Sequence, residues 1–251
     1  MRTALLTDIH ANREALAACL SHAQRMRADR YAYLGDLVGY GADPAWVLDA
    51  VITHVERGAI AVLGNHDAAV LHGPGKGMSA PARQVIEWTR QRLDARHLDF
   101  LADLPLTHET DDALYVHANT WAPERWEYVA SAMDARRSMT ATASRHTFCG
   151  HVHEPGLYHM SPGGRVAAFT PIPGTAIPLA PQRRWLAIPG SVGQPRDGVP
   201  AACYALFDAA QHSLTYYRVP YDFEAAAAKI RAAGLPETFV VLLDPPALIR
   251  P

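Results

Sequence analysis

Polar side chains that can bind metal ions follow several apolar segments of the chain, at the points where these segments end. They form five motifs: Asp8-Ile9-His10, Gly35-Asp36, Gly64-Asn65-His66-Asp67, the single His117, and Gly150-His151-Val152-His153. The apolar segments before them are typical of β-strands. Two divalent cations about 4 Å apart need donors from several strand ends, because no single helix or hairpin presents so many from one side. The motifs therefore predict a two-metal site.

Each motif taken alone also has an ordinary structural explanation. Asp8 and His10 would share one face of any polar strand end, and a pair such as Gly35-Asp36 is common in turns. Gly64–Asp67 is more specific, because Asn, His and Asp together suit neither a core nor a solvated helix start. The Gly-His-x-His motif is stronger still, since two imidazoles two residues apart on an extended segment point the same way. All five motifs in this order favour the metal site.

The donor types favour particular metals and a particular reaction. A mixture of carboxylate, imidazole and amide donors suits Mn²⁺, Fe or Zn²⁺, whereas Ca²⁺ prefers oxygen ligands and Cu(I) prefers thiolates. Two such ions outweigh the charges of Asp8, Asp36 and a bridging hydroxide, so the site would attract a phosphoryl group. The same ions lower the pKa of a shared water. We therefore expect a hydrolase in which a metal-bridging hydroxide attacks phosphorus in line.

Composition sets limits on size, partners and location. The 251 residues are 49% hydrophobic, enough for a large core, and we expect one domain over 1–251. With 23 basic and 25 acidic residues there is no basic excess, which argues against nucleic acid or an anionic membrane as the main partner. No apolar segment has the length of a membrane-spanning helix. Cys19, Cys149 and Cys203 are odd in number and widely spaced, which favours reduced thiols in the cytoplasm.

The elements that must position the motifs alternate between strand and helix in the first quarter of the chain. Strands are predicted at 3–7, 31–34 and 59–63, and helices at 12–27 and 44–55. This β-α-β-α-β order favours a parallel sheet with right-handed crossovers.

The rest of the chain changes character. Helical periodicity from Ser79 to Leu101 predicts one long amphipathic helix, and 222–233 a final helix. Pro- and Gly-rich residues 161–181 are interpreted as an irregular connection. Shorter segments are typical of strands: 114–116, 147–149, 185–188, 202–207 and 214–219.

Two longer segments, Leu34–Gly41 and Pro189–Gly198, together with the five motifs, resemble the calcineurin-like metallophosphoesterase superfamily, and within it the small bacterial and archaeal members. The likeness covers most of the chain, from Asp8 to the predicted final helix. It implies a four-layer αββα sandwich, an α/β fold, with two metals at the carboxyl edges of the strands. It also implies two ligand sets that share one carboxylate: Asp8, His10, Asp36 and His153 for one metal, and Asp36, Asn65, His117 and His151 for the other.

The resemblance gives His66 a role outside both ligand sets. His66 would stabilise the developing charge or protonate the leaving oxygen, with Asp67 orienting its ring. The alternative is that His66 only caps the following helix. Ala11 stands where this family usually has glycine, so a left-handed backbone at that position would be strained.

Three other side chains are candidates for substrate contact. Arg196, in a Gly/Pro-rich loop, is a candidate phosphate clamp, and stabilising the turn is an equally good explanation for it. Lys76 lies in the glycine-rich loop 73–77, which does not follow the P-loop pattern. Asn119, two residues after His117, either touches substrate or packs its own loop.

The substrate class follows from two missing arginines. Protein phosphatases and dinucleoside tetraphosphatases of the family carry arginines where this chain has Leu37–Gly41 and Ala61–Leu63. A guanidinium suits a dianionic monoester, so its absence favours a phosphodiester or another small phosphorylated molecule as the partner. The alternatives are phosphomonoesterase activity of the protein-phosphatase kind and a non-catalytic metal-binding interaction module of the same fold. A homo-oligomer is compatible with each of these functions.

Two other enzyme classes fit the sequence poorly. A nuclease would need a basic or aromatic groove, and none is visible in the sequence. A Gly-x-Ser-x-Gly motif is absent, which excludes the common serine hydrolase pattern.

Overall fold

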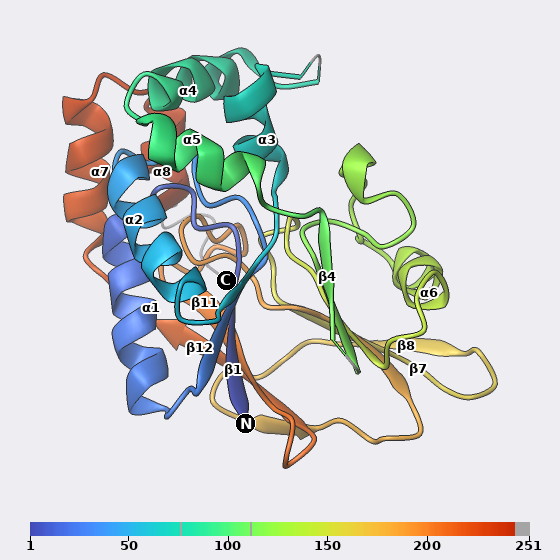
Figure 1. The fold of residues 1–251 in the computed structure, drawn as a ribbon. Helices are drawn as coiled ribbons and strands as arrows, with labels where there is room; N and C mark the ends of the chain where they lie inside the picture. Colours follow the sequence, from blue (N-terminus) through green and yellow to red (C-terminus); the bar gives the residue numbers. More distant parts are fainter. Residues whose placement is uncertain (76, 111, 244–251) are drawn as a thin grey trace.

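The computed structural model describes residues 1–75, 77–110 and 112–243, in which two mixed sheets pack against each other between layers of helices (Figure 1). The first sheet has the order β3-β2-β1-β11-β12-β9 and the second β4-β5-β6-β10-β7-β8. The strands of the first sheet are β1 (Arg2–Leu6), β2 (Arg30–Tyr33), β3 (Ile60–Ala61), β9 (Ala176–Pro178), β11 (Ala202–Asp208) and β12 (Ser213–Val219). Those of the second are β4 (Thr107–Glu109), β5 (Ala113–Val116), β6 (His146–Phe148), β7 (Gly156–Met160), β8 (Val166–Phe169) and β10 (Arg184–Ile188).

Helices cover the outer face of each sheet. α1 packs on β11 and β12 of the first sheet, and α6 packs on β7, β8 and β10 of the second, on the opposite side of the molecule (Figure 1). This arrangement confirms the four-layer αββα sandwich. The helices are α1 (Arg13–Arg25), α2 (Pro44–Val55), α3 (Asn65–His72), α4 (Ala80–Arg90), α5 (Ala95–Ala102), α6 (Ala132–Thr140), α7 (Phe223–Ala232) and α8 (Thr238–Leu243), with a 3₁₀ turn at Pro123–Arg125.

The alternation of side chains along β1 explains why this strand lies at the centre of the fold. Leu5 belongs to the core between the two sheets, whereas Ala4 and Leu6 belong to the core between the first sheet and its helices. Neighbouring residues of a strand point to opposite faces, so both faces of β1 are buried. The Tyr216 hydroxyl crosses the inter-sheet core and donates to the Gly156 carbonyl (2.7 Å).

Parallel strands bring the predicted motifs to one edge of the sandwich. β1, β2 and β3 run parallel in the first sheet, and β5, β6 and β10 run parallel in the second. On its other side β1 pairs with β11 in antiparallel register, with Thr3 opposite Phe207. The segments after β1, β2, β3, β5 and β6 are those that carry the five motifs.

Several sequence-based expectations were wrong in detail. The predicted helix 79–101 is two helices, because Asp94 caps a new helix and the chain turns between α4 and α5. The irregular connection 161–181 contains β8 and β9, which are short edge strands, and β7 precedes it. The helix predicted at 222–233 is followed by α8, which packs against it.

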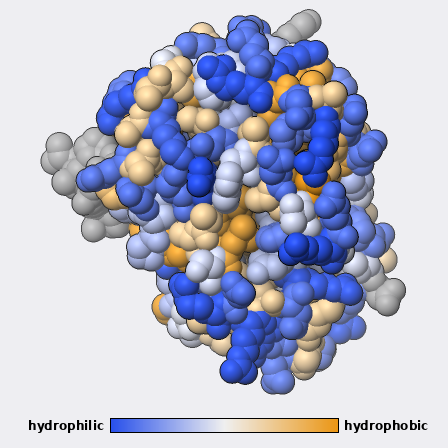
Figure 2. Space-filling view, turned by 60° about the vertical axis from the view of Figure 1, so that its left-hand side comes forward, coloured by the Kyte–Doolittle hydropathy of each residue, from blue (hydrophilic) through white to orange (hydrophobic). Residues whose placement is uncertain are grey.

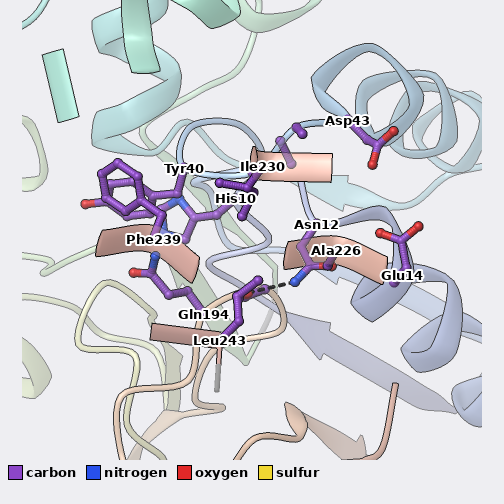
Figure 3. A pocket seen from close by; sticks show the side chains of 14 residues that line it. His10, Asn12, Glu14, Tyr40, Asp43, Gln194, Ala226, Ile230, Phe239 and Leu243 are labelled. Carbon is purple, nitrogen blue, oxygen red and sulfur yellow. Dashed lines mark hydrogen bonds between the residues drawn. The ribbon is translucent and has the colours of Figure 1, made fainter. Parts of the chain in front are cut away.

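The two C-terminal helices cover the loops that follow β1 and β2. The ring of Phe239 in α8 stacks on that of Tyr40, with centroids 4.6 Å apart and planes at 28°. A small cavity of about 10 Å³ lies between these helices and His10 (Figure 3), near the lower limit for one water molecule. The two helices therefore cover the loop that carries His10.

The face shown in Figure 2 is mostly hydrophilic, with its hydrophobic residues in small groups. Every helix in the described part of the chain is too short or too polar to cross a bilayer.

Asp94→Ala should lower the free energy of unfolding by about 1 kcal/mol, because α5 loses its cap. The Asp94 carboxylate accepts from the His97 backbone N–H (3.0 Å). Urea denaturation measures the change. Asp99→Ala is the matched control, since Asp99 lies exposed in the middle of the same helix. Equal losses in the two variants would contradict the capping role.

Candidate metal centre

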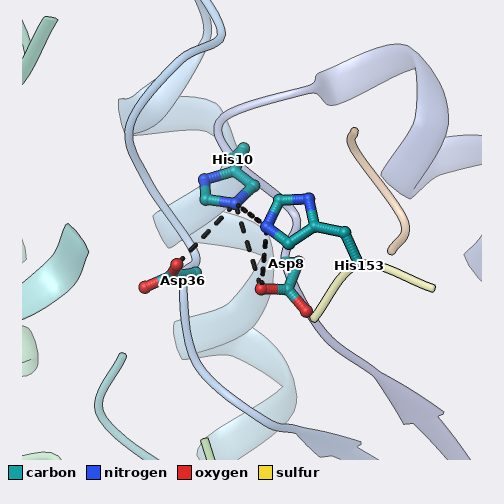
Figure 4. Close-up of side chains that lie close together, drawn as sticks. All are labelled: Asp8, His10, Asp36 and His153. Atoms are coloured by element: carbon teal, nitrogen blue, oxygen red, sulfur yellow. Dashed lines mark hydrogen bonds and ion pairs between the residues drawn. The ribbon is translucent and has the colours of Figure 1, made fainter. Parts of the chain in front are cut away.

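Two groups of buried side chains meet at the carboxyl edge of the sheets. The ligand atoms of the first group lie within 4.8 Å of one another, and so do those of the second. Figure 4 shows the first group, in which the two imidazoles and two carboxylates point toward one another. The groups are Asp8, His10, Asp36 and His153, and Asp36, His117 and His151.

One oxygen of Asp36 lies between the two groups. Its Oδ2 is 3.7 Å from Nε2 of His10 and 3.4 Å from Nε2 of His117. The other oxygen, Oδ1, accepts from the His66 backbone N–H (2.8 Å). This bond fixes the rotation of the carboxylate, so that Oδ2 alone faces both groups.

Each imidazole of the two groups has one nitrogen held by a backbone carbonyl. Nδ1–H of His117 donates to Leu34 (2.7 Å), and Nδ1–H of His153 donates to Gln194 (2.7 Å). His10 is held through Nδ1 by the Val38 carbonyl (3.3 Å), and the Trp126 carbonyl accepts from His151. Such bonds select the tautomer whose other nitrogen carries a lone pair. The other nitrogen of each of the four rings therefore faces into the site.

Two pairs of these nitrogens lie close to each other. Nε2 of His10 is 3.1 Å from Nε2 of His153, and Nε2 of His117 is 3.2 Å from Nδ1 of His151. Burial lowers the pKa of both His10 and His153 well below the usual range, so both rings are neutral near pH 7 and neither Nε2 carries a hydrogen. Facing lone pairs beside buried carboxylates fit divalent cations, for which neutral imidazole and carboxylate are suitable ligands.

The charges of the site favour the same conclusion. Burial alone would raise the pKa of Asp36, but His117 and His66 hold it well below its usual range. Burial lowers the pKa of His117, yet the Asp36 carboxylate outweighs it and raises this pKa to about 9. Burial raises the pKa of Asp8 to about 7. A cation that displaced the His117 proton would satisfy the same carboxylates.

The remaining predicted ligands are also in place. Oδ1 of Asp8 is 3.3 Å from Nε2 of His153, while its Oδ2 accepts from the Thr7 hydroxyl (2.9 Å). Oδ1 of Asn65 is 3.1 Å from Nε2 of His117. All seven side chains predicted as ligands are therefore brought together by the fold, although their binding of metal stays a prediction.

Glycine begins three of the motifs, and at Gly64 and Gly150 a neighbouring segment of the chain passes too close for a side chain. A Cβ at Gly64 would lie 2.1 Å from the backbone nitrogen of Asp36, and one at Gly150 would lie 1.9 Å from the Thr7 hydroxyl oxygen. These distances leave no room for a side chain.

The segment Pro189–Gly198 holds the loop after β1 in position. The Gly193 N–H and the Ser191 hydroxyl both donate to the Asp8 carbonyl, at 2.9 and 2.8 Å. The Val192 N–H donates to the Thr7 carbonyl (3.0 Å). The loop is therefore fixed by residues nearly 200 positions away in the sequence.

Backbone strain is concentrated at the site. Six residues there have φ between +50° and +69°, a region that side chains other than glycine rarely adopt: Asp8, His10, Ala11, Asp36, His151 and His153. Ala11, which stands in place of the usual glycine, has φ +52° and is strained as the sequence suggested.

A cleft of about 660 Å³ opens beside the two groups of ligands. Its lining includes His66 and Arg196, as well as four side chains that the sequence analysis did not select. These four are Tyr40, Arg125, Trp126 and Tyr128. Tyr40 lies in the family-like segment Leu34–Gly41, but the other three belong to a loop with no recognisable motif.

Comparison with known proteins supports the resemblance noted in the sequence. The sequence profile of the calcineurin-like phosphoesterase superfamily domain matches residues 1–212. The chain belongs to this superfamily. An uncharacterized protein of Methanocaldococcus jannaschii is 33% identical over 240 residues, which cover 93% of each chain.

Solved structures with a similar fold agree. The crystal structure of a metallophosphoesterase from Sphaerobacter thermophilus is 36% identical, with a TM-score of 0.86 over 97% of this chain and 98% of the other. A hypothetical protein of Pyrococcus horikoshii, 18% identical, shares the fold with a TM-score of 0.76 over 97% of both chains.

Within this calcineurin-like fold, the structure corrects the role expected for Asp67. Its Oδ1 accepts from the backbone N–H groups of Leu37 (2.9 Å) and Val38 (3.1 Å), and its Oδ2 accepts from Gly64 N–H (3.0 Å). Both oxygens are used by the backbone, so Asp67 does not orient the His66 ring. It braces the loop that follows Asp36.

Asn119 does not line the cleft. It is completely buried, its amide nitrogen donates to the Glu127 carbonyl (2.9 Å), and its oxygen accepts from Ala122 N–H (2.9 Å). This placement fits the packing alternative. Lys76 lies outside the described residues.

Gly64→Ala should reduce the affinity for Mn²⁺ more than about tenfold, because the new methyl group displaces Asp36 as the loss of a supporting group would. Calorimetric titration with Mn²⁺ measures the affinity. Gly163→Ala is the control, since a Cβ there meets only the Ser161 hydroxyl at 4.0 Å. A Gly64→Ala protein with wild-type affinity would refute the steric argument.

Proposed function

We propose that this chain hydrolyses a phosphodiester or another small phosphorylated molecule with the help of two divalent cations, Mn²⁺, Fe or Zn²⁺. The observation that carries the proposal is the convergence on Asp36 of four imidazoles, each held by a backbone carbonyl so that its other nitrogen faces the site. Histidines with a purely structural role would not need to turn their remaining ring nitrogens toward one shared carboxylate. The membership in a phosphoesterase superfamily supports the same reaction class.

The ligand sets would be those expected from the sequence, with Asp36 Oδ2 shared between the two ions. When bound, the cations would polarise phosphoryl oxygens and activate a water molecule. The side chains of the protein would then position the ester. Arg196, exposed at the cleft, is tied to the Gln194 side chain (3.1 Å) and is the candidate phosphate contact.

His66 is the candidate for transferring a proton to the leaving oxygen. It lies in the cleft, has no place in either ligand set, and its buried Nδ1 has no hydrogen-bond partner among the described residues. Burial lowers its pKa, and Asp36 opposes this shift. A bound anionic substrate beside the ring would act in the same direction as Asp36. It would raise the pKa of His66 toward the range where the ring is an effective acid.

The surroundings of Asp36 favour a diester over a monoester. The loop after Asp36 and the segment before Gly64 contain no arginine, so these two segments offer none of the bidentate contacts that suit a dianionic monoester. Phosphomonoesterase activity and a binding module without turnover remain the competing functions. We place the protein in the cytoplasm, because Cys19, Cys149 and Cys203 are free and buried thiols.

Asp36→Asn should reduce Mn²⁺-dependent hydrolysis of bis(4-nitrophenyl) phosphate more than about 100-fold, beyond the usual loss for a group that only supports a ligand. The amide keeps the size of the side chain but cannot bridge two cations. Asp99→Asn, at an exposed helix position, is the matched control. Near-normal hydrolysis by Asp36→Asn would rule out a bridging role.

His66→Ala should retain the metal content of the wild type while losing roughly 100- to 10,000-fold in turnover, the usual contribution of a proton-transfer group. Elemental analysis and steady-state kinetics measure the two quantities. His108→Ala, an exposed histidine of β4, controls for the loss of an imidazole. Loss of metal from the His66→Ala protein would mean that His66 supports the ligands instead.

A further inference from the structure

One wall of the cleft is aromatic. Trp126 and Tyr128 both line it, and 52% of Tyr128 is exposed, a large fraction for an aromatic residue in a concave site. The Tyr128 ring stacks on the His151 imidazole, with centroids 4.2 Å apart and planes at 11°. One face of the Tyr128 ring is therefore covered, and the other faces away from the ligands.

The loop that carries this wall is held firmly. The buried Asn119 amide bridges two points of its backbone, as described above. The Trp121 indole N–H donates to the Glu127 carboxylate (3.1 Å), and Arg137 of α6 packs over the Trp121 ring, 4.4 Å from its centroid. Trp126, held at φ +57°, lies edge-on to His117 with centroids 5.9 Å apart. A ligand would thus meet a wall already in place, which lowers the cost of ordering it.

The other lining residues favour an anionic ligand. Arg125 and Arg196 line the cleft with Asp36 as the only acidic residue among its described lining. The charge of Arg196 reaches the metal ligands, since it lowers the pKa values of His10 and His153. Burial raises the pKa of Tyr40 to about 12, so its phenol remains a neutral hydrogen-bonding group. Tyr40 lies near both Arg196 and Tyr128, whose charges also affect this pKa. The cleft combines positive charge with an exposed aromatic face.

We propose that Tyr128, supported by Trp126, is a stacking subsite for a planar aromatic base in the organic part of the substrate, which makes the substrate a nucleotide-like phosphate ester. This inference rests on the proposed phosphoesterase function. A volume of about 660 Å³ is within the range of pockets for drug-sized ligands and far exceeds the needs of a phosphoryl group alone. An aromatic face on a rigid loop accepts a base regardless of its identity.

Distance favours a base that is separated from the phosphorus by a spacer. The centroid of the Tyr128 ring lies 4.2 Å from that of His151, one of the proposed ligands. A ring stacked on the open face of Tyr128 would lie roughly 4.5 Å farther from His151. A ring bonded directly to a phosphate oxygen would not reach that position. A nucleoside phosphate, in which a sugar separates base and phosphorus, spans the gap.

The test compares three monoesters that share the same phosphate: AMP, ribose 5-phosphate and phenyl phosphate. Calorimetry on the Mn²⁺-loaded protein measures their dissociation constants. We expect AMP to bind at least about fivefold more tightly than either of the others, the lower end of what stacking a base on an aromatic side chain contributes. Tyr128→Phe should keep this preference, and Tyr128→Leu, which still covers His151 but has no aromatic face, should remove it. Phe169→Ala, a half-exposed aromatic residue outside the cleft lining, is the control.

Equal affinities of the wild type for AMP and ribose 5-phosphate would overturn the proposal. A preference for AMP that survives in Tyr128→Leu would also overturn it, because the base would then lie elsewhere. Tight binding of phenyl phosphate equal to that of AMP would point to an aryl ester and contradict the spacer. Metal analysis of each variant separates a lost subsite from a lost metal. Since the measurement is of binding, a protein that prefers AMP but hydrolyses nothing would refute the proposed function and leave the subsite standing.

Discussion

The position of the Asp36 carboxylate is the constraint on which the site depends. One of its oxygens is fixed by the His66 backbone N–H, so the other is left to face imidazoles from both groups. That bond exists only because Gly64 lets the backbone after β3 come within contact distance of the backbone after β2. Asp67 supports the same junction through three backbone bonds. The Gly-Asn-His-Asp motif is thus a device for holding a carboxylate, as well as a source of donors.

The sequence predicted the donors well because their chemistry is unusual. Buried Asp, Asn and His side chains are costly, and strand ends are the place where they converge. It predicted the support of these donors poorly. Asp67 was expected to orient His66, but bonds to three backbone N–H groups satisfy a buried carboxylate better than one imidazole does. Such bonds depend on how loops pass one another, which no local pattern reveals.

The same limit applies to the fold. The order of strands and helices predicted a parallel sheet with crossover helices, and the resemblance to the family implied the αββα architecture. The break at Asp94 could not be recognised by periodicity, because α4 and α5 both bury apolar residues and the apolar spacing runs on across the turn. β8 and β9 are short, and β9 ends in a proline, so their pairing is decided by the neighbouring strands β7 and β12. Tyr128 carries no signal in the sequence, because the role of an exposed aromatic residue depends on its place in the cleft, which only the structure shows.

The pairing of β1 with β11 has a consequence for how the protein comes into being. All seven donor side chains have been made once the ribosome has passed His153, yet the loop bearing Asp8 rests on Ser191 and Gly193, and β1 gains its second neighbour only with residues 202–208. A chain that stops short of these residues therefore contains all seven side chains but lacks the contacts that position the Asp8 loop. The assembly of the seven side chains into one site therefore depends on contacts that residues 191–208 make with β1 and the loop after it.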